Sequence, residues 1–351
     1  MANILIDVGH PAHVHLFRGA ARRWEAAGHT VLFAALDREI ILYLLARYDL
    51  PHAVTYRRGR GKLALLLELF GRTWTTYRLA RRFRPDLFIG IGSPMAGLPA
   101  RLMGKPYIAL TDTEGAGEQH LLFRPFASVI ATPDAFYKSL GAKQVRYPGY
   151  HELAYLHPDE FTPDPAVLQP LGLTSDDTFF IVRFVTWGAT HDIGERGFAL
   201  AEKRAMLREL SRHGRVLLSS EGGIDPEFAP LVTPFPPEAI HHLLAFATLY
   251  VGEGATMATE AAVLGTPAVY VNTLRAGTTA ELEEKYHLLY WCRDGQQAMQ
   301  HTRELLAMPG LEQVAAQRRA RLLAEKINPT PWLADLGERL LQDPSYRPDT
   351  P

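Results

Sequence analysis

Short apolar runs alternate along the chain with longer segments in which apolar positions recur every three to four residues. The first run covers residues 3–8, and a compact run of this kind is typical of a strand buried on both faces of a parallel sheet. In the next segment, residues 13–27, one helical face carries Leu16, Phe17, Ala20, Trp24 and Ala27. The chain is therefore predicted to open with a β-strand and an amphipathic helix.

The same alternation continues through the first half of the chain. Further strands are predicted over residues 29–36, 53–56, 87–92, 106–111, 129–132 and 145–147. Helices are predicted over residues 38–48, 62–83 and 93–103. Repeated strand–helix units of this kind predict a doubly wound parallel sheet.

Residues 151–177 interrupt this pattern with four prolines among acidic residues, which is typical of a linker. The alternation then returns, with strands predicted over 178–184, 215–219, 248–251 and 268–271. Helices are predicted between them over 195–213, 237–247 and 256–264. The fold class predicted is α/β, with two Rossmann-like doubly wound domains that face a central cleft.

The predicted domain limits follow from these elements. Residues 1–150 form the first domain, 151–177 the linker and 178–328 the second domain. Apolar residues at helical spacing in "PTPWLADLGERLLQ" predict that the final segment, 329–351, contains a helix that returns to the first domain. Ligands of such sheets bind beyond the carboxyl ends of the strands, so the strand-to-helix turns are the candidate sites.

Composition restricts the function classes only modestly. Apolar residues make up 47% of the 351 residues and charged residues 21%, as in ordinary globular proteins. The formal net charge of -1 argues against a nucleic-acid partner. The single cysteine, Cys292, excludes an internal disulfide framework and a cysteine zinc site, so a reducing cytoplasm is the expected location.

The segment "GEGATMATEAAVLGTPAVYV", residues 252–271, carries the strongest chemical signal. Gly252 and Gly254 allow a tight turn after a predicted strand, and a helix follows at once. The N–H groups at the start of that helix favour an anion such as a diphosphate. Glu260, one turn further, can accept hydrogen bonds from ribose hydroxyls. The predicted nucleotide-sugar contacts in this turn are Gly252, Gly254, Ala255, Thr256, Met257 and Glu260. Alternatively, this is a glycine-rich turn without a ligand.

These residues resemble the nucleotide-sugar site of two-domain glycosyltransferases of the GT-B fold. The segment is similar to that of the lipid-linked N-acetylglucosaminyltransferases of peptidoglycan synthesis and of non-hydrolysing UDP-N-acetylglucosamine 2-epimerases. In those proteins a glutamate on this helix holds the ribose, and Glu260 matches its position. The whole chain resembles the domain-of-unknown-function 354 family, which typically opens with a strand and a D-x-G-H-P-A-H-V-H stretch, matched here by Asp7–His15.

Three histidines crowd the first strand-to-helix turn in "GHPAHVH", residues 9–15. In the peptidoglycan enzymes a glycine-rich loop ending in histidine occupies this turn, and the resemblance places His13 on that histidine. A histidine with an ordinary pKa of about 6.5 can take a proton from an acceptor hydroxyl, so His13 and His10 are predicted catalytic residues. Alternatively, one imidazole caps the helix and His15 packs into the core.

Two further segments contribute candidates. In "TDTEGAGEQH", residues 111–120, Asp112 and Glu114 are predicted catalytic carboxylates, and the alternative is a solvated acidic loop. The 2-epimerases keep acidic catalytic residues in comparable first-domain loops. In "TWGATHDIGERG", residues 186–197, Thr190-His191 and Glu195-Arg196 resemble the T-x-H-R-x-E-N motif of the epimerases with a different spacing, and this resemblance implies that His191 contacts phosphate or sugar.

The loop "SSEGG", residues 219–223, adds Ser220 and Glu221 to the predicted nucleotide-sugar contacts, although its glycines can also simply make a turn.

The segment 57–84 contains nine basic residues and one acidic residue, Glu68, with leucines and aromatic residues between them. A basic amphipathic helix can bind anionic lipid at the inner face of the membrane. The alternative is a core-facing helix with a solvated basic edge.

Together these patterns predict a GT-B-like glycosyltransferase that moves a sugar from a nucleotide-diphosphate sugar, with UDP expected, to an unknown glycan or lipid-linked acceptor. His13 would act as the base, and the helix at residue 256 would stabilise the leaving diphosphate. No D-x-D element follows a strand, so no metal and no cofactor are expected. A nucleotide-sugar 2-epimerase and a non-catalytic nucleotide-sugar binding protein remain the alternatives.

Overall fold

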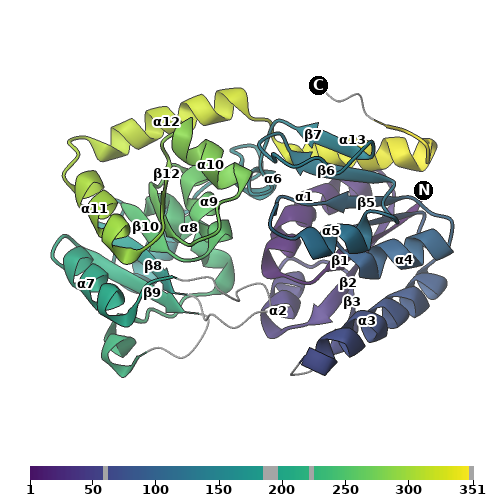
Figure 1. Cartoon of the computed structure of the whole chain (residues 1–351), viewed down its shortest axis with the longest axis horizontal. Helices are drawn as coiled ribbons and strands as arrows, with labels where there is room; N and C mark the ends of the chain where they lie inside the picture. The colour runs from purple at the N-terminus through teal and green to yellow at the C-terminus, as the bar shows by residue number, and fades with distance from the viewer. Residues whose placement is uncertain (58–61, 185–196, 221–224, 348–351) are drawn as a thin grey trace. The chain divides into compact units, whose positions relative to one another are not determined.

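The structure of the chain is a computed structural model that describes residues 1–57, 62–184, 197–220 and 225–347. The chain divides into two compact units (Figure 1). Unit 1 comprises Met1–Tyr155 and Ile327–Pro351, and unit 2 comprises Leu156–Lys326. Each unit holds a parallel sheet with helices packed on it, which is the α/β class that the alternating pattern predicts.

Among the described residues, unit 1 has a seven-stranded parallel sheet in the order β3-β2-β1-β4-β5-β6-β7. The strands are β1 (Asn3–Val8), β2 (Thr30–Asp37), β3 (His52–Arg57), β4 (Leu87–Ile91), β5 (Tyr107–Leu110), β6 (Val129–Pro133) and β7 (Gln144–Tyr147). The chain moves from β1 outward to β3, returns to β4 beside β1, and continues in the other direction. This reversal places the topological switch point between β1 and β4, where ligands of doubly wound sheets bind.

Two groups of helices cover the sheet of unit 1. α1 (Pro11–Ala26) packs against α2 (Glu39–Arg47) and α13 (Pro329–Gln342). α3 (Lys62–Phe83) packs against α4 (Pro94–Leu102), which in turn packs against α5 (Gly117–Phe123). α13 is fixed to α1 by a hydrogen bond of 3.1 Å from the Trp24 indole N–H to the Ala334 carbonyl oxygen. The last helix of the chain thus belongs to the same unit as the first.

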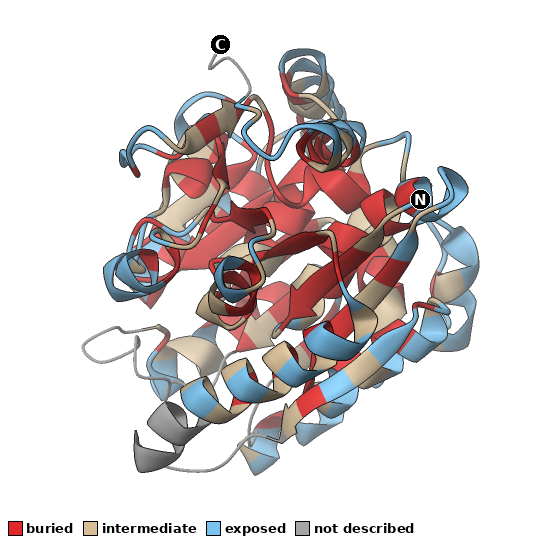
Figure 2. Ribbon diagram, turned by 90° about the vertical axis from the view of Figure 1, so that its right-hand side faces the viewer, coloured by how far each residue is buried: buried red, intermediate tan, exposed pale blue. Residues whose placement is uncertain are grey.

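The burial pattern explains why these segments form strands and helices. The apolar run of β1 is buried throughout, with Ile4, Ile6 and Val8 fully inaccessible. α1 buries its apolar face, including Trp24, while Arg22 remains exposed. Figure 2 shows the same division, with buried strands inside and exposed outer faces on the helices. The predicted opening strand and amphipathic helix are confirmed.

Unit 2 also contains a parallel sheet. Within the described residues this sheet has five strands in the order β12-β11-β10-β8-β9. The strands are β8 (Phe179–Phe184), β9 (Arg215–Ser220), β10 (Leu249–Gly252), β11 (Ala268–Val271) and β12 (Leu289–Cys292). The helices are α7 (Leu200–Ser211), α8 (Ile240–Phe246), α9 (Ala255–Leu264), α10 (Gly277–Glu284), α11 (Gly295–Leu306) and α12 (Leu311–Glu325). The switch point of this sheet lies between β8 and β10.

The structure differs from the predicted elements in several places. α5, β12 and α10–α12 were not predicted, and α5 occupies part of the segment expected to be an acidic loop. α1 begins at Pro11, two residues earlier than predicted, because proline suits the first position of a helix. The boundary between the units falls between Tyr155 and Leu156, inside the predicted linker, which itself contains α6 (Leu153–Leu156) and the 3₁₀ helix η1 (Pro165–Leu171).

Within the described part of the chain, no helix is both long enough and apolar enough to pass through a lipid bilayer.

Candidate functional site

The turn between β1 and α1 gives its three histidines three different surroundings. His10 is the N-cap of α1, and its Nδ1 accepts a hydrogen bond of 3.2 Å from the Ala12 N–H. His15 is 4% exposed and packs against the rings of Tyr48 and Tyr155, with centroid distances of 5.7 and 5.4 Å. The two structural alternatives for this cluster therefore apply to different residues: His10 caps the helix, and His15 packs into the core.

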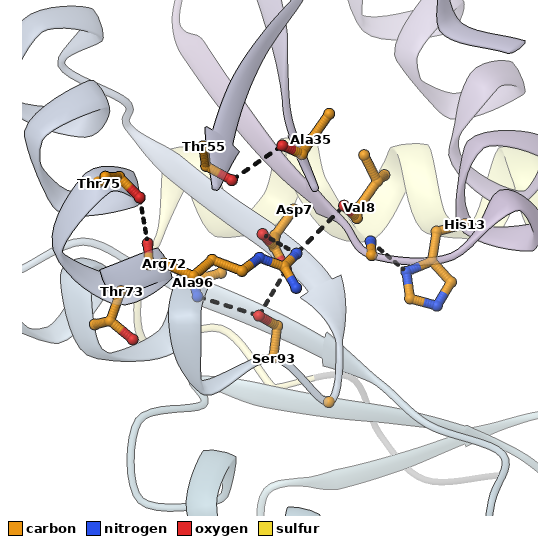
Figure 3. Close-up of polar contacts among 12 residues, drawn as sticks. Asp7, Val8, His13, Ala35, Thr55, Arg72, Thr73, Thr75, Ser93 and Ala96 are labelled. Carbon is orange, nitrogen blue, oxygen red and sulfur yellow. Dashed lines mark hydrogen bonds and ion pairs between the residues drawn. The ribbon is translucent and has the colours of Figure 1, made fainter. Parts of the chain in front are cut away.

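His13 has a different environment, because its Nδ1 accepts a hydrogen bond of 3.3 Å from the backbone N–H of Gly9 (Figure 3). This bond assigns the proton of the neutral ring to Nε2. Burial lowers the pKa of His13 well below 6.5, helped by the charges of His10, Arg72 and His151 and opposed by Asp112. The ring is thus neutral near pH 7 and offers an N–H donor, whereas the predicted role as a base requires a lone pair on the free nitrogen.

A buried polar network holds the end of β1 in place (Figure 3). The Arg72 side chain reaches from α3, and its Nη2 lies 2.8 and 2.9 Å from the two carboxylate oxygens of Asp7 and 3.2 Å from the Val8 carbonyl oxygen. The Ser93 hydroxyl donates a hydrogen bond of 2.7 Å to Asp7 and caps α4 by accepting the Ala96 N–H. β1, α3 and α4 are therefore tied together at the switch point.

The space beside Gly9 in this turn is tight. A side-chain Cβ at Gly9 would lie 3.0 Å from Nη1 and 3.3 Å from Nη2 of Arg72. The guanidinium group thus occupies the space beside the backbone at the point where β1 enters α1. Arg72 is 4% exposed, so the charge beside His13 is a fixed part of the turn.

Asp112 follows β5 and lies within hydrogen-bond distance of His151, which follows β7. His151 Nδ1 lies 3.1 Å from the Asp112 carboxylate, and the Thr113 hydroxyl donates a further hydrogen bond of 3.0 Å. Burial raises the pKa of Asp112, but the hydrogen bond from His151, together with the charge of that ring when it is protonated, outweighs this effect and lowers the pKa to about 2. Asp112 is therefore a permanent anion at neutral pH, and it is not a proton donor there.

Glu114 lies elsewhere in the same loop and is 2% exposed. Its carboxylate accepts a hydrogen bond of 3.3 Å from the Tyr137 N–H, and its carbonyl oxygen accepts one of 2.8 Å from Lys138. These contacts fix the segment between β6 and β7 to the loop after β5. The structure thus gives Glu114 a supporting position rather than the exposed one of a solvated acidic loop.

At the carboxyl edge of the unit 1 sheet, His10, Arg72, Asp112 and His151 all act electrostatically on His13. Arg72 and His151 were not predicted. Arg72 belongs to the basic helix for which a lipid contact was considered, and its inward orientation shows only in the burial pattern of α3. His151 lies at the start of the predicted linker, where no periodicity marks its neighbours.

In unit 2, β10 ends at Gly252 and α9 begins directly after Gly254, so the strand leads into the helix through the predicted glycines. A Cβ at Gly252 would lie 2.1 Å from the Tyr250 hydroxyl oxygen and 3.0 Å from the Arg183 carbonyl oxygen, so no side chain fits there. Gly254 is the N-cap of α9, and it has no side chain that could compete for the first N–H groups of the helix. Ala255, Thr256 and Met257 form this first turn and are half-buried.

Glu260 lies further along α9 and is 5% exposed. One carboxylate oxygen is 3.0 Å from Nε2 of His241, a residue of α8 that is 2% exposed and was not predicted. The carboxylate is therefore oriented by a buried imidazole. A ribose hydroxyl that binds the Glu260 carboxylate has to do so while the hydrogen bond to His241 remains.

Three predicted nucleotide-sugar contacts remain, and of these Ser220 lies within the described residues. Ser220 is the last residue of β9, at the carboxyl edge of the unit 2 sheet. His191 and Glu221 lie outside the described residues. In the part of the chain that the structure describes, no group of three or more histidine, cysteine, aspartate or glutamate side chains has a geometry suited to a metal ion.

The chain resembles known proteins both in sequence and in structure. No family model matches the chain, so the resemblance to the domain-of-unknown-function 354 family stays a prediction. The UDP-N-acetylglucosamine–N-acetylmuramyl-(pentapeptide) pyrophosphoryl-undecaprenol N-acetylglucosamine transferase of Pseudomonas fluorescens is 34% identical over 178 residues. The match covers 47% of this chain and 49% of the relative, so the chain spans about half the length of that protein.

Two solved structures match over almost the whole length. MnaA of S. aureus, solved with UDP, has a TM-score of 0.71 and 11% identity, with all of both chains covered. A protein of Listeria monocytogenes described as a UDP-N-acetylglucosamine 2-epimerase has a TM-score of 0.69 and 13% identity, with 99% of this chain and 98% of that chain covered. These matches confirm the predicted GT-B-like fold class of two Rossmann-like units.

Proposed function

We propose that the protein transfers a sugar from a UDP-sugar to an acceptor hydroxyl. The observation that carries this proposal is the turn from β10 into α9, where a glycine-only strand end leads directly into a helix with a glycine N-cap. This turn is at the switch point of unit 2, and the N–H groups of α9 favour a diphosphate there. The partial match to a relative named as an N-acetylglucosamine transferase supports the same chemistry.

In this proposal the two units have separate tasks. The positive end of α9 stabilises the negative charge that grows on the diphosphate as the bond to the sugar breaks. Because this stabilisation increases toward the transition state, it accelerates transfer and does not only tighten binding. Glu260, held by His241 at 3.0 Å, accepts hydrogen bonds from the ribose hydroxyls. Side chains at the carboxyl edge of the unit 1 sheet take up the proton of the acceptor hydroxyl.

The proposal includes no metal and no cofactor beyond the nucleotide sugar, because the helix N-terminus supplies the positive field that a metal would otherwise provide. Turnover should therefore be the same with and without a chelator. A loss of activity with EDTA that returns on addition of Mg²⁺ would contradict this part of the proposal.

The test is product analysis with UDP-N-acetylglucosamine as the first substrate and candidate glycan or lipid-linked acceptors added in turn. Release of UDP that depends on an acceptor identifies a transferase. An isomeric UDP-sugar formed without an acceptor identifies an epimerase, and binding without any product identifies a non-catalytic protein. The last two results would each reject the proposed transferase.

The second candidate function is a nucleotide-sugar 2-epimerase. It is supported by the whole-length structural match to the Listeria protein, for which the TM-score is 0.69. Both candidates require the nucleotide in the β10–α9 turn of unit 2. They differ in what the proton-transferring groups of unit 1 do, because an epimerase moves protons within the sugar and needs no acceptor.

We also propose that α3 contacts the surface of a membrane when the acceptor is lipid-linked. Arg72, Thr76 and Ala80 bury one face of α3. On its outer side Phe70 and Trp74 are 70% and 59% exposed, and Arg78, Arg81 and Arg82 are exposed as well. Large apolar side chains beside arginines are suited to the interface of an anionic bilayer.

A further inference from the structure

Two histidines of unit 1 have opposite neutral tautomers. His13 Nδ1 accepts the Gly9 N–H at 3.3 Å, so the neutral ring carries its proton on Nε2. His151 Nδ1 lies 3.1 Å from the Asp112 carboxylate, which can only accept, so this ring carries its proton on Nδ1. The second nitrogen of neutral His13 is therefore a hydrogen-bond donor, and the second nitrogen of neutral His151 is an acceptor.

His151 Nε2 is a buried atom that makes no hydrogen bond within the described residues. The side chain of His151 is 7% exposed. The Tyr147 ring is stacked on it at a centroid distance of 6.3 Å, and the Tyr147 hydroxyl is also buried without a hydrogen bond in the same described region. Native proteins leave few buried polar atoms unpaired. Two such atoms on neighbouring rings indicate that a polar group of a ligand belongs beside them.

We propose that His151, oriented by Asp112, is the catalytic residue that accepts the proton of the acceptor hydroxyl, and that His13 is a hydrogen-bond donor in the same site. This inference rests on the proposed transferase function. The hydroxyl O–H bond breaks, the proton moves to Nε2 of His151, and the oxygen bonds to the anomeric carbon of the sugar. The bond from that carbon to the diphosphate breaks, and its electron pair leaves with the diphosphate.

The charges around the two rings support this division of roles. Asp112 stays ionised, so it stabilises the positive charge that His151 gains when it takes the proton. His13 resists protonation, because burial lowers its pKa and the nearby positive charge of Arg72 acts in the same direction. Of the two imidazoles, His151 is therefore the one whose Nδ1 is held by a carboxylate and whose Nε2 has no hydrogen-bond partner within the described residues. After transfer it releases the proton to water.

The first test uses the variant His151→Asn. The asparagine amide can take the place of Nδ1 and donate to Asp112, but no atom of it replaces Nε2. Turnover of UDP-N-acetylglucosamine should fall by about 10²–10⁴-fold, the usual range for general acid–base catalysis, with UDP affinity unchanged. In His151→Gly, added imidazole should restore part of the turnover. Wild-type turnover in His151→Asn, or no rescue in a folded His151→Gly, would overturn the inference.

The second test does not depend on turnover. Nitrogen–proton correlation spectra of the ¹⁵N-labelled protein at pH 8 report which ring nitrogen of each histidine is protonated, and His151→Asn and His13→Asn identify the two signals. The inference requires a proton on Nδ1 of His151 and on Nε2 of His13. A proton on Nε2 of His151 would overturn it. If the wild type converts no nucleotide sugar, the proposed function fails, while these spectra still decide whether the basic nitrogen exists.

Discussion

Arg72 and Asp7 form an ion pair that is almost fully excluded from water, with side-chain exposures of 5% and 4%. In such a pair the attraction between the two charges offsets the cost of removing them from water. Removal of one partner leaves the other charge buried without this compensation. The Ser93 hydroxyl donates a further hydrogen bond to Asp7, and the Val8 carbonyl oxygen accepts one from Arg72. At the scale of single residues, the geometry of the β1–α1 turn therefore depends on a side chain from α3.

We expect Arg72→Met to lower the free energy of unfolding by about 3–5 kcal/mol, because Asp7 would stay buried and unpaired. The matched control is Arg78→Met on the same helix, where the side chain is exposed and the change should stay within about 0.5 kcal/mol. Urea denaturation followed by circular dichroism measures both values. Equal, small effects of the two substitutions would contradict the role assigned to Arg72.

His13 should make stability depend on pH in a defined direction. Its pKa in the folded chain lies below the unfolded value of about 6.5, so protonation favours the unfolded state. The stabilisation is complete above pH 6.5 and is lost as the pH falls below that value toward the folded pKa. His13→Asn keeps an acceptor for the Gly9 N–H but cannot titrate.

Urea denaturation at pH 7.5 and pH 5.5 should therefore show the wild type losing up to about 1.4 kcal/mol more than His13→Asn on acidification. This difference corresponds to one proton taken up by the unfolded chain over about one pH unit. The same loss in both proteins would mean that His13 titrates normally in the folded chain.

At the scale of elements, the sequence predicted most of the strand–helix units because their apolar runs and helical faces are local patterns. α1 is an example, since the predicted apolar positions Leu16, Phe17, Ala20 and Trp24 are all buried within its sixteen residues. Between β11 and the final helix the pattern predicts no element. There α10 has an alanine N-cap, whose side chain cannot accept a hydrogen bond, and β12 is only four residues long.

The candidate site could be predicted only in part, for a related reason. The glycine turn before α9 is contiguous in the sequence, so its chemistry can be inferred from spacing. Asp112 and His151 are separated by 39 positions, and Arg72 and Asp7 by 65. Partners at such distances come together only through the order of the strands, which local periodicity does not reveal.

The outer face of α3 gives a prediction at the same scale. The double variant Phe70→Ser, Trp74→Ser should float at least severalfold less with vesicles that contain phosphatidylglycerol, because these exposed side chains supply the apolar contact. The control is Leu102→Ser on α4, an exposed leucine outside this face, which should float like the wild type. Equal flotation of the double variant and the wild type would remove α3 from the membrane contact.

At the scale of the whole molecule, each unit is a doubly wound sheet with its candidate residues at the carboxyl ends of strands beside a switch point. Unit 2 carries the glycine turn and the Glu260–His241 pair. Unit 1 carries the histidines and the Asp112 carboxylate. We therefore expect unit 2 to bind the nucleotide and unit 1 to transfer the proton, so variants of unit 2 should change nucleotide affinity and variants of unit 1 should change turnover.

Calorimetric titration with UDP tests this assignment most directly. We expect the wild type to bind one UDP per chain. Glu260→Gln, which keeps a hydrogen bond to His241 but removes the charge, should bind it about 1–3 kcal/mol more weakly. His151→Asn should bind UDP like the wild type. Absence of UDP binding, or equal affinities of the wild type and Glu260→Gln, would contradict the nucleotide site at the β10–α9 turn.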